Sequence, residues 1–174
     1  RLDDLQNLIK IRQGDFTGMR NVFLYIFSYH KALTLNTQKD VIQSVYEAFK
    51  DVYSRTDKEL SKREFEKTVK SAYKDAKECF ENYQKHGNRL MSRQNDGIKK
   101  PYKTDNLIKK LSITEEEQRL MRSIRNHEIA KEQHAKYMKV KRQNDGTHKQ
   151  DKQTYLNSLK EQSNNRIDQF KQLL

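Results

Sequence analysis

Apolar residues recur at helical spacing along most of the chain and almost nowhere alternate with a period of two. The first half holds four such stretches. The first ends near Gly14, and the other three begin at Thr17, after Thr37 and after Ser61. The stretch that begins at Thr17 is apolar on nearly every side, which is typical of a helix at the centre of a core. We therefore expect an all-α fold with a compact helical bundle over residues 1–88.

Three helix starts are predicted from side chains that can accept backbone N–H groups. Thr17 is expected to cap the central helix. Ser61 with Glu64, and Thr114 with Glu117, have the spacing of a capping box, in which each side chain bonds the backbone of the other residue.

Beyond the bundle, glycine and amide-rich residues predict a linker over 86–103, and residues 89–174 are expected to form a basic helical extension. It would hold a short helix after Thr104, a long helix from Thr114 to about Arg142, a turn at 144–146 and a last helix. The apolar positions of that last helix are Tyr155, Leu156, Leu159, Ile167 and Phe170. The string Arg-Gln-Asn-Asp-Gly occurs at 93–97 and 142–146, and we interpret it as two similar turns rather than a repeat.

Charge is distributed unevenly over the chain, whose net charge is +12. Residues 1–88 carry 16 Lys and Arg against 13 Asp and Glu, whereas 89–174 carry 20 against 11. With 33% hydrophobic and 34% charged residues, only part of the chain can be densely packed. A concentration of positive charge attracts polyanions, so nucleic acid is the first partner to consider.

The candidate nucleic-acid-binding residues lie in two places. Around Pro101, cations flank an aromatic ring that can stack on an unpaired base. Along the predicted long helix, arginines recur every three residues and lysines follow, a stripe that can track phosphates. The candidates are Lys99, Lys100, Tyr102, Lys103, Arg119, Arg122, Arg125, Lys131, Lys136, Lys139, Lys141 and Arg142. The competing interpretation is a solvated surface whose charge only keeps the protein soluble.

Residues 107–120 have the spacing of a helix-turn-helix, with the second helix starting at Thr114. The turn that would face base edges is Glu115-Glu116-Glu117, and three carboxylates repel phosphates. A structural corner is therefore favoured over base readout.

Catalytic and metal sites are not expected. Cys79 stands alone without neighbours that activate a thiol, so we expect a structural cysteine. His127 and His134 lack further ligands for a metal ion, and Asp3, Asp4 and the three glutamates stand at helix starts, where the helix dipole favours acids. No cofactor, small-molecule substrate, signal peptide or membrane span is evident. We therefore expect a non-enzymatic, soluble, cytoplasmic protein. Because the chain begins at Arg1 and ends on two leucines, we also expect it to be a piece of a larger protein.

Two motifs in the first half resemble the helical primase C-terminal (PriCT-type) domain. Gly18-Met19-Arg20-Asn21 opens an apolar helix, and Leu60-Ser61-Lys62-Arg63-Glu64-Phe65 is followed by Val69-Lys70-Ser71-Ala72. The resemblance covers about 15–73, with Glu59 where the family usually has Pro. It implies a helical domain that follows a primase-polymerase or related module in replication initiators of bacterial plasmids and mobile elements, and the family's acidic metal-binding residues would lie before Arg1.

Together these observations predict a non-catalytic helical DNA-binding or assembly region of a plasmid or mobile-element replication initiator. Its partners would be DNA, contacted mainly through phosphates, other domains of a larger protein, and a second copy of the chain. The alternative is a helical protein-interaction or oligomerisation module that does not bind nucleic acid.

Overall fold

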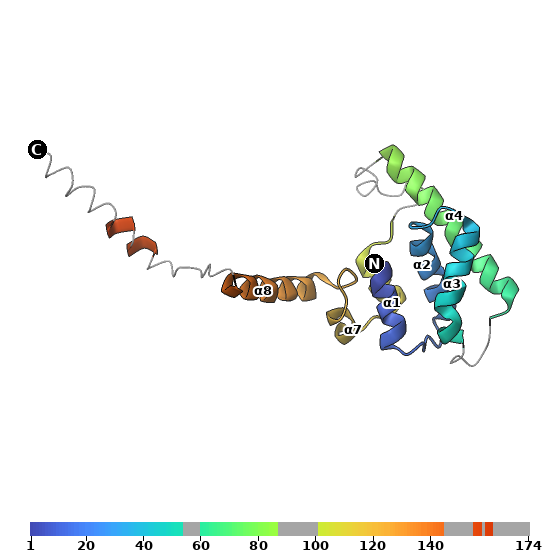
Figure 1. The fold of residues 1–174 in the computed structure, drawn as a ribbon, viewed down its shortest axis with the longest axis horizontal. Coiled ribbons are helices and arrows are strands. Elements are labelled where there is room, and N and C mark those ends of the chain that lie inside the picture. The colour runs from blue at the N-terminus through green and yellow to red at the C-terminus, as the bar shows by residue number, and fades with distance from the viewer. Residues whose placement is uncertain (54–59, 87–100, 145–154, 158, 162–174) are drawn as a thin grey trace, which may run out of the picture. The chain divides into compact units, whose positions relative to one another are not determined.

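The computed structural model describes residues 1–53, 60–86, 101–144, 155–157 and 159–161 (Figure 1). The fold is all-α, as predicted, and these residues contain no strand. The helices are α1 (Leu2–Ile11), α2 (Arg20–Ala32), α3 (Gln38–Tyr53), α4 (Lys62–His86), α6 (Thr104–Lys110), α7 (Glu115–Arg119) and α8 (His127–Asn144).

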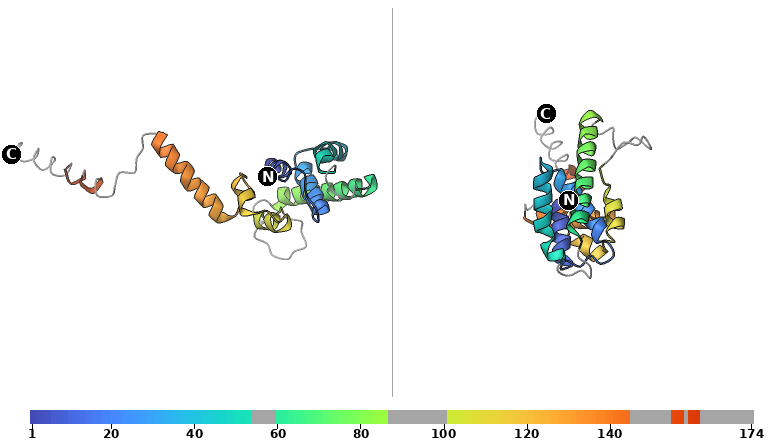
Figure 2. Two further views of the ribbon diagram at one scale, coloured as in Figure 1. Left: turned by 90° about the horizontal axis from the view of Figure 1, so that it is seen from below. Right: turned by 90° about the vertical axis from the view of Figure 1, so that its right-hand side faces the viewer.

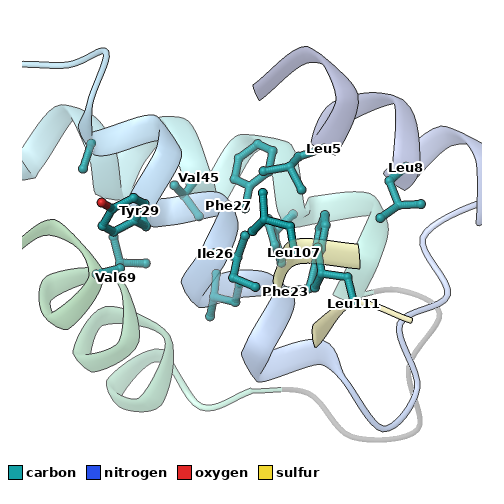
Figure 3. Packing of buried hydrophobic residues seen from close by; sticks show 14 of the residues in the cluster. Leu5, Leu8, Phe23, Ile26, Phe27, Tyr29, Val45, Val69, Leu107 and Leu111 are labelled. Carbon is teal, nitrogen blue, oxygen red and sulfur yellow. The ribbon is translucent and has the colours of Figure 1, made fainter. Parts of the chain in front are cut away.

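Helix α2 is the central helix of the core, which confirms the expectation from its apolar pattern. It packs most extensively against α4, and also against α3 and α1. The Phe23 ring stacks on Phe16 with centroids 3.8 Å apart and lies 5.5 Å from Phe49 of α3. Figure 3 shows Phe23 and Phe27 among apolar side chains from the surrounding helices. Burying rings of this size contributes most of the apolar area of a small core.

The segment after residue 100 belongs to the same core. Leu107 and Leu111 are fully buried in the same cluster as Leu5 and Phe23 (Figure 3). Ile113, Met121 and Ile124 join this cluster as well. One compact unit therefore spans Arg1–Ile129, and the other spans Ala130–Leu174. The first unit extends past residue 88, where the sequence pattern placed the end of the bundle, because these apolar residues complete its core.

The helix starts follow the predicted capping chemistry with one exception. Ser61 and Glu64 form the expected reciprocal bonds, and Thr114 with Glu117 forms a complete capping box. The prediction for Thr17 is wrong, because α2 begins at Arg20 and Thr17 instead donates from its backbone N–H and its hydroxyl to Asp15.

The predicted long helix from Thr114 to Arg142 is also wrong. Helix α7 ends at Arg119 and α8 starts at His127, with a non-helical segment, 120–126, between them. The left-hand view of Figure 2 shows this interruption between the two helices. The cause is a set of side chains that bind the backbone of this segment, described below.

Some sequence predictions fall outside the described residues. These are Lys99, Lys100, the Asn-Asp-Gly turn at 95–97, the last two residues of the turn at 144–146, most of the 86–103 linker, and Ile167 and Phe170 of the last predicted helix. Of that helix, Tyr155, Leu156 and Leu159 are described; all three are helical and exposed.

Candidate nucleic-acid interface

A buried carboxylate at the start of α1 holds the segment between α7 and α8. Asp4 is 1% exposed and accepts the backbone N–H groups of Arg122 at 2.8 Å, Ser123 at 2.6 Å and Ile124 at 2.9 Å, besides the Ser123 hydroxyl. Burial acts to raise the pKa of Asp4, but these hydrogen bonds outweigh it, so the pKa lies below the usual value. Because these amides bond a side chain rather than helical carbonyls, the helix cannot run through them.

The amide of Gln118 supports the same interruption. Its Nε2 donates to the Ile113 carbonyl at 3.1 Å, and its Oε1 accepts the Asn126 N–H at 2.8 Å. Asn126 then accepts the Ile129 N–H at 2.8 Å through its side chain, which makes it the N-cap of α8. One helix therefore ends and another begins within eight residues.

An ion pair fastens α7 to the end of α1. The Arg12 guanidinium donates to both Glu117 carboxylate oxygens, at 2.6 and 2.8 Å, and both side chains are largely buried. The hydrogen bond from Arg12 lowers the pKa of Glu117 by more than burial raises it, so this pKa lies below its usual value. A bidentate pair of this kind is geometrically specific.

The same guanidinium covers the turn of the candidate helix-turn-helix. Arg12 Nη2 donates to the carbonyls of Leu111 and Ser112, both at 3.1 Å. Helix α7 has only five residues, and Glu117 in its first turn is bound by Arg12 and its own cap. This geometry fits the structural corner favoured by the sequence, since a recognition helix must present its first turn to a groove.

Tyr102 is half-buried against the core rather than displayed on a linker. Its ring meets Tyr29 edge-on with centroids 5.0 Å apart and lies 6.1 Å from the His30 ring. Arg1 donates to the Tyr102 carbonyl and, at 3.1 Å, to the Thr104 hydroxyl. Burial raises the pKa of the Tyr102 phenol. These contacts correct the expectation of an aromatic ring ready to stack on a base, whereas the neighbouring Lys103 is exposed.

The three candidate arginines do not form a helical stripe. Arg119 is the last residue of α7, while Arg122 and Arg125 lie in the 120–126 segment, which corrects the predicted placement on one helix. Arg119 and Arg122 are exposed, and Arg125 is half-buried.

Helix α8 keeps the predicted lysines together. Its only buried residue is Ile129. It carries five cations, all exposed, and only two carboxylates, those of Glu128 and Glu132. Lys136 pairs with Glu132 at 2.8 Å on an exposed face, a contact that stabilises an isolated helix slightly. The cations are Lys131, Lys136, Lys139, Lys141 and Arg142. The helix therefore offers several positive charges to solvent along one short rod.

No family model, curated protein or solved structure matches the chain. The resemblance to a primase C-terminal domain therefore stays a prediction carried by the two motifs alone.

A metal site, a reactive cysteine and a membrane-spanning helix are the other features to consider in the described residues. Those residues contain no group of three or more His, Cys, Asp and Glu side chains that could hold a metal ion. Cys79 is a buried free cysteine whose thiol pKa is raised by burial, which suits a structural role. Among the described helices, none is long and apolar enough to cross a membrane.

Sequence reasoning missed the residues that organise this region. Nothing local distinguishes Asp4 from the exposed Asp3, because its partners lie about 120 positions away. Asn126 carried a usable signal, since Asn is a favoured N-cap, but the helical spacing on both sides obscured it. Arg12 had no signal beyond its place at the end of an amphipathic stretch.

Proposed function

We propose that this chain is a non-catalytic helical module that binds DNA mainly through its phosphates, with α8 as the principal contact. The observation that carries the proposal is the surface of α8, which exposes five cations against two carboxylates and buries only Ile129. Cations presented in this way neutralise phosphates and release counterions, which supplies most of sequence-independent affinity.

The composition of α8 also favours a polyanionic partner. A helix that is polar on nearly all sides gains little from packing, which is the main source of helix stability in proteins. The Asn126 cap and the Lys136–Glu132 pair each contribute only modestly. Phosphates bound to these cations would reduce the mutual repulsion of the lysines, so DNA binding and helix stability would reinforce one another.

Phosphate contact is a better-supported mode than base readout. The first turn of α7 carries three carboxylates, one of them committed to Arg12, and no other described element offers a short helix followed by a free recognition helix. We therefore expect weak sequence preference and strong salt dependence.

The wider context rests on the resemblance over residues 15–73. On that basis the chain is a region of a replication initiator from a bacterial plasmid or mobile element, and any primase-polymerase chemistry would come from another part of that protein. The compact unit would then serve as a helical platform for another module of that protein, and the basic helix would bind DNA.

The test replaces Lys131, Lys136 and Lys139 by Gln together and measures affinity for a fluorescein-labelled 20-base-pair DNA duplex at several salt concentrations. A matched control replaces the exposed Lys10, Lys50 and Lys109 by Gln, so that both variants fall from +12 to +9. The α8 variant should have a slope of log affinity against log salt that is smaller in magnitude by about 2–3, because each lost phosphate contact removes about 0.9. Equal slopes for the two variants would remove α8 from the proposal.

The alternative, a protein-interaction module, has one specific observation in its favour. Tyr137 and Val140 lie three residues apart on α8 and are 61% and 54% exposed. Two apolar side chains at this spacing can pair with another helix. Light scattering combined with a gel shift distinguishes the two functions, because a stable dimer that does not shift the duplex at physiological salt would favour the alternative.

A further inference from the structure

The outer side of α4 carries a second concentration of positive charge. Its buried side consists of Phe65, Val69, Ala72, Ala76 and Cys79. On the opposite side, four exposed cations recur at spacings of four, three and four residues, which places them within an arc of about 60° over roughly 16 Å. We call Arg63, Lys67, Lys70 and Lys74 the basic face of α4.

The net charge of the first half conceals this face. Residues 62–74 contain five Lys and Arg against two Glu, the same numbers as α8 in fewer positions. Both of these glutamates have partners: Glu64 completes the capping box with Ser61, and Glu66 pairs with Lys70 at 3.1 Å. Asp75, the residue directly after Lys74, accepts the Tyr25 hydroxyl. The carboxylates that balance the sequence count therefore lie beside the face or at its far end.

A shallow hollow of about 750 Å³ adjoins the basic face between α4 and the start of α3. Lys70, Ser71 and Lys74 line it from α4 together with Lys77, whose ammonium donates to the Leu35 carbonyl at 3.0 Å. Hydroxyl and ammonium donors around one hollow suit phosphate oxygens. Glu78 and Glu81 close the far end of the hollow, so a phosphate strand would lie toward Arg63.

We propose that the basic face of α4 is a second DNA-binding surface, and that its ligand is the sugar-phosphate backbone of a duplex. A duplex fits better than a single strand, because single strands are held by exposed aromatic platforms and the face has none. Tyr73, whose ring lines the adjoining hollow, is half-buried, and its hydroxyl donates to the Asn36 carbonyl at 2.8 Å. The proposal shares its ligand with the proposed function but places the contact on the other compact unit.

The experiment replaces Lys67, Lys70 and Lys74 by Gln in the full chain. The 20-base-pair duplex and its isolated labelled strand serve as separate probes, and the triple variant of Lys10, Lys50 and Lys109 is the control with the same net charge of +9. Gln retains good helix propensity at exposed positions, and unchanged circular-dichroism melting confirms that each variant folds.

For the duplex, the slope of log affinity against log salt should be smaller in magnitude by about 2–3 in the α4 variant, while the control changes it by less than about 0.5. A slope equal to that of the control overturns this inference, as does an effect confined to the single strand. If the salt slope for the duplex changes in the α4 variant and not in the α8 variant, this inference stands and the proposed DNA contact of α8 is contradicted. If the unaltered chain binds no duplex at 50 mM salt, both fail.

Discussion

Replacing Asp4 by Asn should destabilise the compact unit far more than the same change at Asp3. Both residues lie in the first turn of α1, but Asp3 is exposed and Asp4 accepts four hydrogen bonds from residues 122–124. Asn keeps one acceptor oxygen and turns an NH₂ group toward backbone donors. A hydrogen bond to a charged group contributes about 1.5–3 kcal/mol, and an unsatisfied buried donor costs about 1–3 kcal/mol.

We therefore expect Asp4→Asn to lower the free energy of unfolding by about 2–3 kcal/mol, which corresponds to roughly 6–12 °C in Tm for a unit of this size. Asp3→Asn should cost about 0.5 kcal/mol, the value of a carboxylate near a helix N-terminus. Urea unfolding followed by circular dichroism at pH 7 measures both. Equal losses within about 0.5 kcal/mol would refute the assignment of Asp4 as the anchor of the 120–126 segment.

The difference between the two variants should also depend on pH. The pKa of Asp4 is lowered in the folded protein from its usual 3.8, so its contribution is fully present above that value and disappears as the pH falls through the folded pKa. The gap between wild type and Asp4→Asn should therefore be constant from pH 5 to 8 and narrow below about pH 4. A gap that widens on acidification would contradict this reasoning.

Three further predictions concern the core and the cap of α8. Glu117→Gln should cost about 2–3 kcal/mol in urea unfolding, against less than 0.5 for the exposed Glu116→Gln, because only the former breaks the Arg12 pair. Asn126→Ala should lower helical ellipticity and stability by about 1 kcal/mol, and Asn126→Asp, which retains the cap, should not. Phe23→Ala should cost about 3–5 kcal/mol, or prevent folding altogether, whereas a loss below 1 kcal/mol would place the core elsewhere.

Local chemistry predicted the elements that depend on neighbours in sequence. The capping boxes at Ser61 and Thr114 and the apolar pattern of α2 each depend on residues within a few positions. The break after α7 depends on Asp4, which is more than a hundred positions away, so no window of sequence contains its cause. Thr17 is not a cap because α2 begins three residues later, at Arg20, with Met19 at the N-cap position.

The candidate site shows the same division between local and distant causes. Exposure of the lysines on α8 follows from local polarity and was predictable. Burial of Tyr102 depends on Tyr29 and His30 of α2, and was not. A charge count over half of the chain does not reveal the basic face of α4, because it averages the two sides of the helix.

The most direct test of phosphate binding is the affinity of the unaltered chain for the labelled duplex between 50 and 200 mM salt. Contacts by the α8 cations predict a log-log slope of at least about 4 in magnitude, so affinity should fall more than about 200-fold. Absence of binding at 50 mM salt, or an affinity that stays constant across this range, would contradict the account.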